Sequence, residues 1–296
     1  MATAGSVTVA PPAVPAGRPA RPGLVWLLAA NPGAVAGLAV LALLAAGAMA
    51  APALTPYSPT AIDLGGAADP PSAAHWFGRD QVGRDILTRI LYGARLSLLV
   101  GFLAVGIGVA VGAPVGLVAG YLGGPADLLV MRLVDVMMAF PSILLALLVV
   151  TVLGPGLENA MVAVGVAAIP LFARLARASA LSVKEMEYVA AARALGQSTV
   201  RIVARHVAPN CVAPLVVQAT LRVGTAILTA ASLSFLGLGV QPPSPEWGAM
   251  VSEGRTYITT APHITIFPGL AIVLAVLGFN VLGDSLNDAL NPSLRS

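Results

Sequence analysis

The chain has 296 residues, of which 57% are hydrophobic and 10% are charged, and its mean hydropathy is +0.88. Ordinary globular domains carry about 25% charged residues, so this composition excludes a soluble domain and indicates a protein embedded in a membrane. The formal net charge is +3 and the sequence pI is about 9.4, which we interpret as the charge asymmetry of membrane topology and not as a signal of nucleic-acid binding.

The chain begins with residues 1–23, a segment rich in Ala, Pro and Gly that predicts a flexible cytoplasmic tail. The apolar run that follows is interrupted by Asn31 and Pro32, so we expect no signal peptide. Apolar stretches with few charged residues, long enough to cross a bilayer, predict an all-α membrane protein with about six transmembrane helices, at residues 33–52, 95–121, 130–153, 157–174, 211–235 and 265–284.

The positions of Lys and Arg predict the orientation of these spans, because cytoplasmic segments are enriched in basic residues. With the N-terminus inside, ten basic residues are cytoplasmic and four are external. The cytoplasmic ones are Arg18, Arg21, Arg132, Arg295 and the six within residues 174–210, and the external ones are Arg79, Arg84, Arg89 and Arg255. We therefore expect both termini in the cytoplasm.

The longest predicted external segment, residues 53–94, contains His75, Asp80 and Asp85 among several arginines. These three residues could suggest a metal site, but a lone histidine among alternating Asp and Arg residues is weak evidence for one. We expect the acidic residues to pair with the arginines instead, and we predict no metal site in the chain.

The second predicted span contains four glycines at intervals of four residues: Gly108, Gly112, Gly116 and Gly120. On a helix they align as one smooth ridge that lets a neighbouring backbone approach closely. The spacing predicts a helix-packing interface and leaves open whether the neighbour belongs to this chain or to a second protein.

Two charged residues fall within or beside the spans, and such residues are functional candidates. Arg222 lies within the fifth span. Asp135 lies near the inner end of the third, where an ion pair with Arg132 explains it equally well. Cys211 is the only cysteine, so an intrachain disulfide is excluded, and we expect this residue to pack as a small apolar side chain.

The most polar stretch lies between the fourth and fifth spans, at residues 174–210. It holds six of the sixteen Lys and Arg residues and two of the thirteen acidic residues, which gives it a net charge of +4. Charge alone is consistent with a solvated positive loop between two spans. The alternative is a docking element for a cytoplasmic partner.

Local signals in this stretch predict a helix, a break and a second helix. Ser182 and Glu185 fit a capping box at the start of the first helix, which ends at Gly196. Ser198 can cap a second short helix, and Pro209 is expected to terminate it.

The same stretch resembles the cytoplasmic loop of ABC importer permeases, whose pattern is E-A-A-x3-G-x9-I-x-L-P. The matching residues are Ala191, Ala192, Gly196 and Pro209. Ala190 stands at the motif's Glu, and His206 and Ala208 stand at its Ile and Leu. The resemblance therefore implies a two-helix docking loop that lacks the motif's carboxylate.

Other segments resemble the dipeptide/oligopeptide/nickel (Opp/Dpp) branch of this family, specifically its C-type permease subunit. Residues 75–85 are similar to the pattern H-x-F-G-T-D-x-x-G-R-D, with Arg79 replacing Thr. Residues 232–248 are similar to S-L-S-F-L-G-L-G-x-x-P-P-x-P-x-W-G. The resemblance covers roughly residues 75–292, and by it the chain is identified as a member of this family.

The resemblance implies a type I ABC importer permease fold, with a first transmembrane helix and external loop at residues 24–94, a core permease domain at 95–296 and a cytoplasmic coupling loop at 174–210. It implies a permease subunit of an ATP-driven importer of dipeptides, oligopeptides or related small solutes in the cell (inner/plasma) membrane. The implied partners are a second homologous permease, which shares the translocation pathway, two ATP-binding subunits or domains, and an extracytoplasmic substrate-binding protein.

The resemblance also assigns two sets of site residues. The residues implied to couple the chain to the ATPase lie in the loop 182–209 and are Ser182, Glu185, Glu187, Tyr188, Ala191, Ala192, Leu195, Gly196, Arg205 and Pro209. The implied external docking segment contains His75, Phe77, Gly78, Asp80, Gly83, Arg84 and Asp85.

The chain carries no catalytic motif. Its single lysine, Lys184, follows Val183, whereas a phosphate-binding loop needs Gly-Lys-Ser/Thr, so we predict that the chain is not an enzyme and binds no cofactor. The resemblance places ATP and Mg²⁺ on the partner ATPase subunits.

Two rival functions come from other classes. One is an ion- or proton-coupled secondary transporter that uses Asp135 or Arg222, and the other is a membrane scaffold that transports nothing. The apolar spans show no obvious selectivity code, so dipeptides, oligopeptides, nickel chelates and related solutes are not distinguished.

Overall fold

The computed structural model of the protein describes residues 28–290, so the predicted tail at 1–23 and Arg295 lie outside the described residues. The α-helices within this range are α2 (Pro32–Leu54), α3 (Ile86–Leu122), α4 (Gly124–Met138), α5 (Ser142–Leu153), α6 (Leu157–Lys184), α7 (Glu187–Ala194), α8 (Thr199–Ile202), α9 (Ala208–Phe235), α10 (Trp247–Gly254) and α11 (His263–Leu290). Two 3₁₀ turns, η1 (Leu64–Gly66) and η3 (Arg255–Tyr257), and a π-helical turn, η2 (Val203–Val207), accompany them.

Between residues 28 and 290, five helices are long and apolar enough to cross a membrane: α2, α3, α6, α11, and the helix that α8, η2 and α9 form together. α4 and α5 pass the same criterion only when they are taken together as a sixth span. They are separated by a short break, at which the chain bends by 93°. The all-α membrane class is therefore confirmed, but the prediction of one helix over residues 130–153 is wrong. Pro141 has no N–H to donate and disfavours helical backbone at Phe140, and hydropathy registers neither effect.

α3 begins nine residues before its predicted start at residue 95. The Asp85 carboxylate caps the helix by accepting the Thr88 N–H at 2.7 Å. Arg95, at the predicted start of this span, donates to the carbonyl of Ala48 in α2 at 2.7 Å. Charged residues at this end are thus satisfied within the protein, and the helix extends through them.

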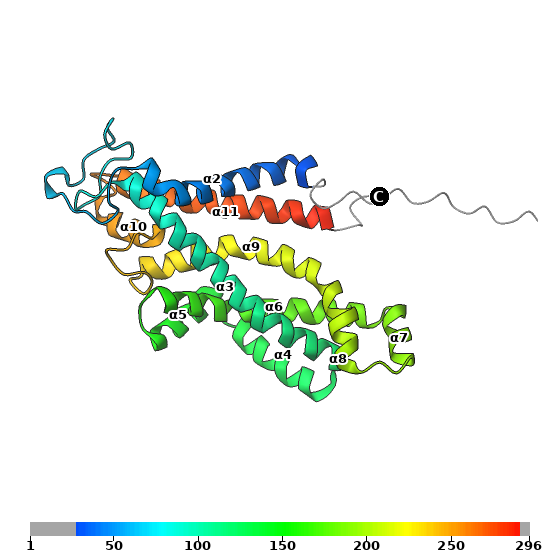
Figure 1. The fold of residues 1–296 in the computed structure, drawn as a ribbon. Coiled ribbons are helices and arrows are strands. Elements are labelled where there is room, and N and C mark those ends of the chain that lie inside the picture. The colour runs from blue at the N-terminus through cyan, green and yellow to red at the C-terminus, as the bar shows by residue number, and fades with distance from the viewer. Residues whose placement is uncertain (1–27, 291–296) are drawn as a thin grey trace, which may run out of the picture.

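Figure 1 shows α2 and α11 side by side along one edge of the molecule, while α3 crosses from this pair toward α6. α9 packs against α11, α3 and α6, and α5 packs against α6. The connection between α2 and α3 lies together with α10 at one end of the bundle, and α7 and α8 lie at the opposite end. We call these ends the loop end and the arm end.

The loop end is anchored to the spans by a buried tryptophan. Trp247, the first residue of α10, is fully buried, and its indole N–H donates to the carbonyl of Ile90 in α3 at 3.0 Å. Gly93 leaves room for the ring, since an added Cβ there would lie 3.3 Å from Trp247 Cδ1. The short helix α10, which the hydropathy pattern does not predict, is therefore fixed on α3.

Candidate functional site

The polar stretch forms an arm at the arm end, consisting of residues 185–207 with α7, α8 and η2. α7 is followed by Gly196, whose φ of +75° is a left-handed conformation that suits glycine. Ser198 occupies the N-cap position of α8, but its side chain does not make the predicted cap hydrogen bond. The predicted break and the predicted start of the second helix are confirmed by the backbone.

The predicted start of the first arm helix is wrong. Ser182 lies inside α6, which continues to Lys184, and Glu185 follows its last turn. Met186 occupies the N-cap position of α7 and makes no side-chain cap. The capping-box pattern failed because α6 extends ten residues beyond its predicted end at 174.

The predicted end of the second arm helix is also wrong. α8, η2 and α9 form one continuous helix, Thr199–Phe235, that runs through Pro209. The π-helical turn accommodates the proline. The Ala208 N–H donates to the carbonyl of Val203, five residues back, and Pro209 then occupies the first turn of α9, where a missing N–H is tolerated.

The arm has one buried face and one exposed face. The side chains that hold it against the spans are Val189, Ala192, Ile202 and Val207. On the outer side, Leu195 is 81% exposed and Val200 is 78% exposed. The other exposed coupling residues are Ser182, Glu185, Glu187, Tyr188, Ala191, Gly196, Arg205 and Pro209, whereas Ala192 is buried. Large apolar side chains exposed beyond the ends of the spans indicate a surface that another protein covers.

Two ion pairs join α4 to the arm end of α6. Arg177 holds Asp127 through two hydrogen bonds of 2.6 and 2.7 Å, and Arg174 pairs with Asp135 at 2.5 Å. Asp135 is therefore in an ion pair, although its partner is not Arg132. The Asp135 side chain is 53% exposed, so it is a surface acid and not a buried coupling carboxylate.

The four glycines of α3 lie against α6. An added Cβ at Gly108 would lie 2.8 Å from the Ala168 Cβ, at Gly112 2.5 Å from the Ile169 carbonyl oxygen, and at Gly120 2.8 Å from the Arg177 carbonyl oxygen. At Gly116 it would overlap the carbonyl of Ala173. The neighbour that the sequence left open is thus α6 of this chain, and glycine is needed because backbone meets backbone.

The loop between α2 and α3 builds a buried group of ion pairs with α10, here called the loop-end cluster: Asp80, Arg84, Arg89 and Glu253. Arg84 lies 2.5 Å from Asp80 and 2.5 Å from Glu253. Arg89 lies 3.4 Å from Asp80 and 3.5 Å from Glu253. The expected pairing of Asp with Arg is confirmed. Glu253 was missed, because it lies 169 residues from Arg84 in the sequence.

His75 also joins a pairing network. Its Nδ1 lies 2.8 Å from the Asp85 carboxylate, and its Nε2 lies 2.7 Å from the Arg79 guanidinium. Across residues 28–290, no group of three or more His, Cys, Asp or Glu side chains is placed to hold a metal ion. The histidine therefore orients the loop.

The residues assigned to the external docking segment face inward. The polar ones, His75, Asp80, Arg84 and Asp85, are at most 9% exposed, Gly78 and Gly83 are buried, and Phe77 stacks on Phe267 at 4.2 Å. Ion pairing draws these side chains into the loop, so the assignment of this segment to docking stays a prediction. The large apolar side chains that the same loop exposes most are Ile62, Leu64 and Trp76.

Glu246 caps α10 from a buried position at the loop end. Its two carboxylate oxygens accept the N–H groups of Gly248 at 2.9 Å and Ala249 at 2.8 Å. Burial raises the pKa of the Glu246 carboxyl, and these hydrogen bonds oppose the rise only in part.

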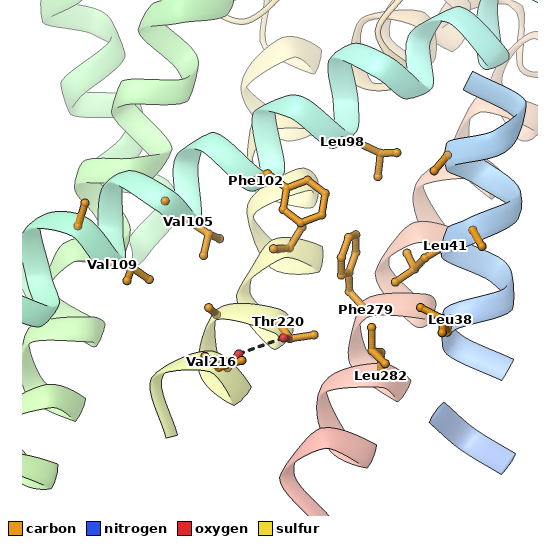
Figure 2. Close-up of a pocket in the computed structure, with 16 residues that line it drawn as sticks. Leu38, Leu41, Leu98, Phe102, Val105, Val109, Val216, Thr220, Phe279 and Leu282 are labelled. Atoms are coloured by element: carbon orange, nitrogen blue, oxygen red, sulfur yellow. Dashed lines mark hydrogen bonds between the residues drawn. The ribbon is translucent and has the colours of Figure 1, made fainter. Parts of the chain in front are cut away.

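A large cavity of about 700 Å³ lies between α2, α3, α9 and α11. Figure 2 shows that aliphatic side chains and the rings of Phe102 and Phe279 line it. The hydroxyl of Thr220 already donates to the Val216 carbonyl at 3.0 Å. This cavity presents a hydrocarbon surface, and no charged side chain lines it.

Arg222 lies on a different face of α9. It lines two smaller cavities beside α5 and α6, of about 190 and 30 Å³, and both cavities also contain Ser142. α9 therefore separates an apolar cavity from a region that contains a positive charge.

The chain matches two protein-family descriptions. Residues 112–296, more than half of the chain, match the family described as binding-protein-dependent transport system inner membrane component. Residues 24–71 match the N-terminal transmembrane domain of oligopeptide transport permease C.

Curated relatives are similar over most of their length. A dipeptide transport system permease protein of Alkalihalophilus pseudofirmus is 50% identical over 89% of this chain and 86% of the relative. A glutathione transport system permease protein of Pectobacterium atrosepticum is 50% identical over 88% of this chain and 87% of the relative. A probable D,D-dipeptide transport system permease protein of Escherichia coli is 44% identical over 91% and 90%, respectively.

A solved structure has the same fold. An inward-facing structure of the MetNI methionine ABC transporter contains a chain that aligns with a TM-score of 0.55 and 22% sequence identity. The alignment covers 67% of this chain and 94% of that chain. The helical arrangement is thus that of an ABC importer permease.

Proposed function

Because this chain belongs to the family of binding-protein-dependent transport system inner membrane components, we propose that it is one of two permease subunits in an ATP-driven importer of peptides or related small solutes. The names of its relatives support a peptide-like solute, since they are permeases for dipeptides, D,D-dipeptides and glutathione. The second permease would be a homologue of this chain, and the two would enclose the translocation pathway.

The exposed apolar surface of the arm supports the proposal that this chain is coupled to separate ATPase subunits. Leu195 and Val200 point away from the spans, while Val189 and Ile202 fix the opposite side of the arm. An ATPase that covers Leu195 and Val200 would act on both flanking spans, because α6 leads into the arm and α8 continues into α9. We propose this surface, with Tyr188 beside it, as the ATPase-docking site.

The arm end is cytoplasmic in this proposal. It carries Arg132 and the basic residues of the segment 174–210, whereas the basic residues at the loop end are fewer. The loop end would then face the extracytoplasmic binding protein, and its exposed Ile62, Leu64 and Trp76 are the proposed contacts. Both termini would be cytoplasmic.

ATP hydrolysis is assigned to the partner subunits, with ATP and Mg²⁺ bound there. Lys184, the single lysine, follows Val183 and lies at the end of α6, so it does not belong to a phosphate-binding loop. The rival reading of an ion-coupled carrier gains nothing from Asp135, which is paired with Arg174.

The test is co-purification. A tagged chain would be expressed with its second permease and its ATPase subunits, and the purified complex would be assayed for bound ATPase and for ATP-driven uptake of dialanine in proteoliposomes. Leu195→Asp places a charge in the proposed docking surface and should remove the ATPase from the complex.

Leu64→Asp is the matched control, because Leu64 is 72% exposed but lies at the loop end. It should leave bound ATPase unchanged, whatever its effect on the binding protein. A Leu195→Asp complex that keeps its full complement of ATPase would contradict the proposed docking surface, and dialanine uptake that persists without ATPase would contradict the importer.

A further inference from the structure

The guanidinium of Arg222 has no polar partner within residues 28–290. Several other arginines near or within the spans have polar partners: Arg84 pairs with Asp80 and Glu253 in the loop-end cluster, Arg89 donates to the Pro59 carbonyl at 2.9 Å, Arg95 donates to α2, and Arg177 holds Asp127. Arg222 makes no comparable hydrogen bond or ion pair and is only partly exposed. An unpaired charge at the middle of a membrane span is costly, so it indicates a water-accessible path or a partner that comes and goes.

The surroundings of Arg222 define the charge of that partner. The larger of its two cavities is lined by the break between α4 and α5, including Met138, Phe140 and Ser142, and by α6. The smaller one adds Thr225 and Thr229. Neither cavity is lined by an acidic side chain. The local field is therefore positive, which favours an anionic group and disfavours a cation.

The same face of α9 carries further polar residues at helical spacing. They are Gln218, Arg222, Thr225, Thr229 and Ser232, at intervals of four, three, four and three residues, and none of them is fully buried. Residues at these intervals lie on one face of a helix. We call this face the polar stripe of α9.

The hydroxyl groups of the polar stripe are oriented as acceptors. Thr225 donates to the Arg222 carbonyl at 3.0 Å, and Thr229 donates to the Thr225 carbonyl at 2.8 Å. Ser232 likewise donates to the carbonyl four residues before it, at 2.8 Å. Each hydroxyl donates its hydrogen to a backbone carbonyl of α9, so its oxygen lone pairs are left to accept a hydrogen bond from a donor outside the helix.

We propose that the polar stripe is this chain's contribution to the solute path and that Arg222 binds the carboxylate of a peptide-like solute. This inference rests on the proposed function, since it assumes that a solute passes between two permeases. The guanidinium fork matches a carboxylate in two parallel hydrogen bonds. The hydroxyls of Thr225 and Thr229 accept from the amide or ammonium N–H groups of the same solute.

The first measurement does not depend on transport. In the complete complex in proteoliposomes, with Cys211→Ser as background, Thr225→Cys should react with a charged, membrane-impermeant thiol reagent, and saturating dialanine should slow the reaction. Ile227→Cys is the matched control, because Ile227 is on the same helix and only 2% exposed. Equal labelling rates at the two positions would overturn the proposal.

The second measurement is ATP-driven uptake of radiolabelled dialanine and of its C-terminal amide. Arg222→Gln should lower dialanine uptake about tenfold or more, which is the effect of losing a charged hydrogen bond, and should reduce the preference for dialanine over the amide. Arg222→Lys keeps the charge without the fork and should give intermediate uptake. Arg132→Gln, on an exposed arginine of α4, should have wild-type uptake.

These outcomes separate this inference from the proposed function. Wild-type dialanine uptake and an unchanged preference in Arg222→Gln would overturn the role of Arg222 while leaving the importer intact. A wild-type complex that takes up no dialanine would contradict the proposed peptide substrate, and the labelling comparison would still decide whether the polar stripe faces an aqueous path.

Discussion

The loop-end cluster and the arm are two charged regions at opposite ends of this molecule, and they differ in where their charged side chains point. At the loop end, Asp80, Arg84 and Arg89 are at most 5% exposed and neutralise one another together with Glu253. In the arm, Arg193, Arg201 and Arg205 are exposed, and none forms an ion pair within the described residues. Ion pairs therefore stabilise the folded loop end, whereas the unpaired charges of the arm are exposed to a partner.

The difference teaches how each region should respond to substitution. A buried charge that loses its partner destabilises the fold, because neither water nor another protein group replaces the lost contact. An exposed charge contributes little to the stability of the isolated chain and acts through what binds it. Variants of the loop end should therefore change thermal stability, and variants of the arm should change assembly.

The largest effect is expected from Asp80→Ala. This substitution removes the acceptor of Arg84 and one neighbour of Arg89, so the free energy of unfolding should fall by about 3–5 kcal/mol. The measurement is the thermal midpoint of the purified complex in detergent.

Asp63→Ala is its control, because Asp63 also pairs with an arginine, Arg79, but its side chain is 60% exposed. Its thermal midpoint should match that of wild type. If both variants had the same thermal midpoint, burial would not distinguish the loop-end cluster from a surface ion pair. The contrast with the arm would then be wrong.

The next effect concerns α3 and α6, which connect the two ends of the molecule. A Cβ at Gly116 would overlap the carbonyl of Ala173, so Gly116→Ala must push the helices apart and should cost about 1–3 kcal/mol. Gly106→Ala on the same helix meets no atom within 4 Å and should be neutral or slightly stabilising. Thermal midpoints measure both, and equal midpoints would rule out the tight α3–α6 contact.

The smallest effect is a pH dependence from Glu246. Burial raises its pKa above the ordinary value of 4.5, so between 4.5 and the raised pKa the folded state binds more protons than the unfolded state. The contribution of Glu246 is therefore present below pH 4.5 and lost as pH rises through the folded pKa, with a slope of at most about 1.4 kcal/mol per pH unit.

Glu246→Gln removes the titration while keeping one acceptor for the cap. Thermal melts of both proteins across pH 4–8 should show wild type losing stability relative to the variant as pH rises. Parallel curves would mean that the carboxyl is not desolvated, and the loop end would be less rigid than its burial indicates.

Hydropathy and charge bias predicted the helical class, five of the spans and the arm, because each depends on composition over many residues. They did not predict the 93° bend at Pro141 or the short helix that begins at Trp247. Both depend on a few residues whose backbone hydrogen bonding or burial is decided by tertiary contacts, which a sliding average does not detect.

Partners distant in sequence were harder to predict than the residues that need them. The spacing of Gly116 predicted a closely packed neighbouring helix but did not identify it as α6. The position of Asp135 predicted an ion pair, but its partner is Arg174 and not Arg132. The polar stripe of α9 is visible in the sequence as a 4-3-4-3 spacing of polar residues through Arg222. Hydropathy did not predict it, because Thr and Ser lower the mean hydropathy of an apolar span only slightly.

The continuous helix Thr199–Phe235 has a mechanical consequence. Val200, at the surface proposed for the ATPase, and Arg222, in the proposed solute path, lie on this one helix, at most about 33 Å apart at 1.5 Å per residue. Turning the helix by about 10° would shift one site by up to about 6 Å relative to the other, enough to withdraw a guanidinium from hydrogen-bonding range. Nucleotide-driven closure and release of a carboxylate would then be linked through one continuous helix, with no intervening loop.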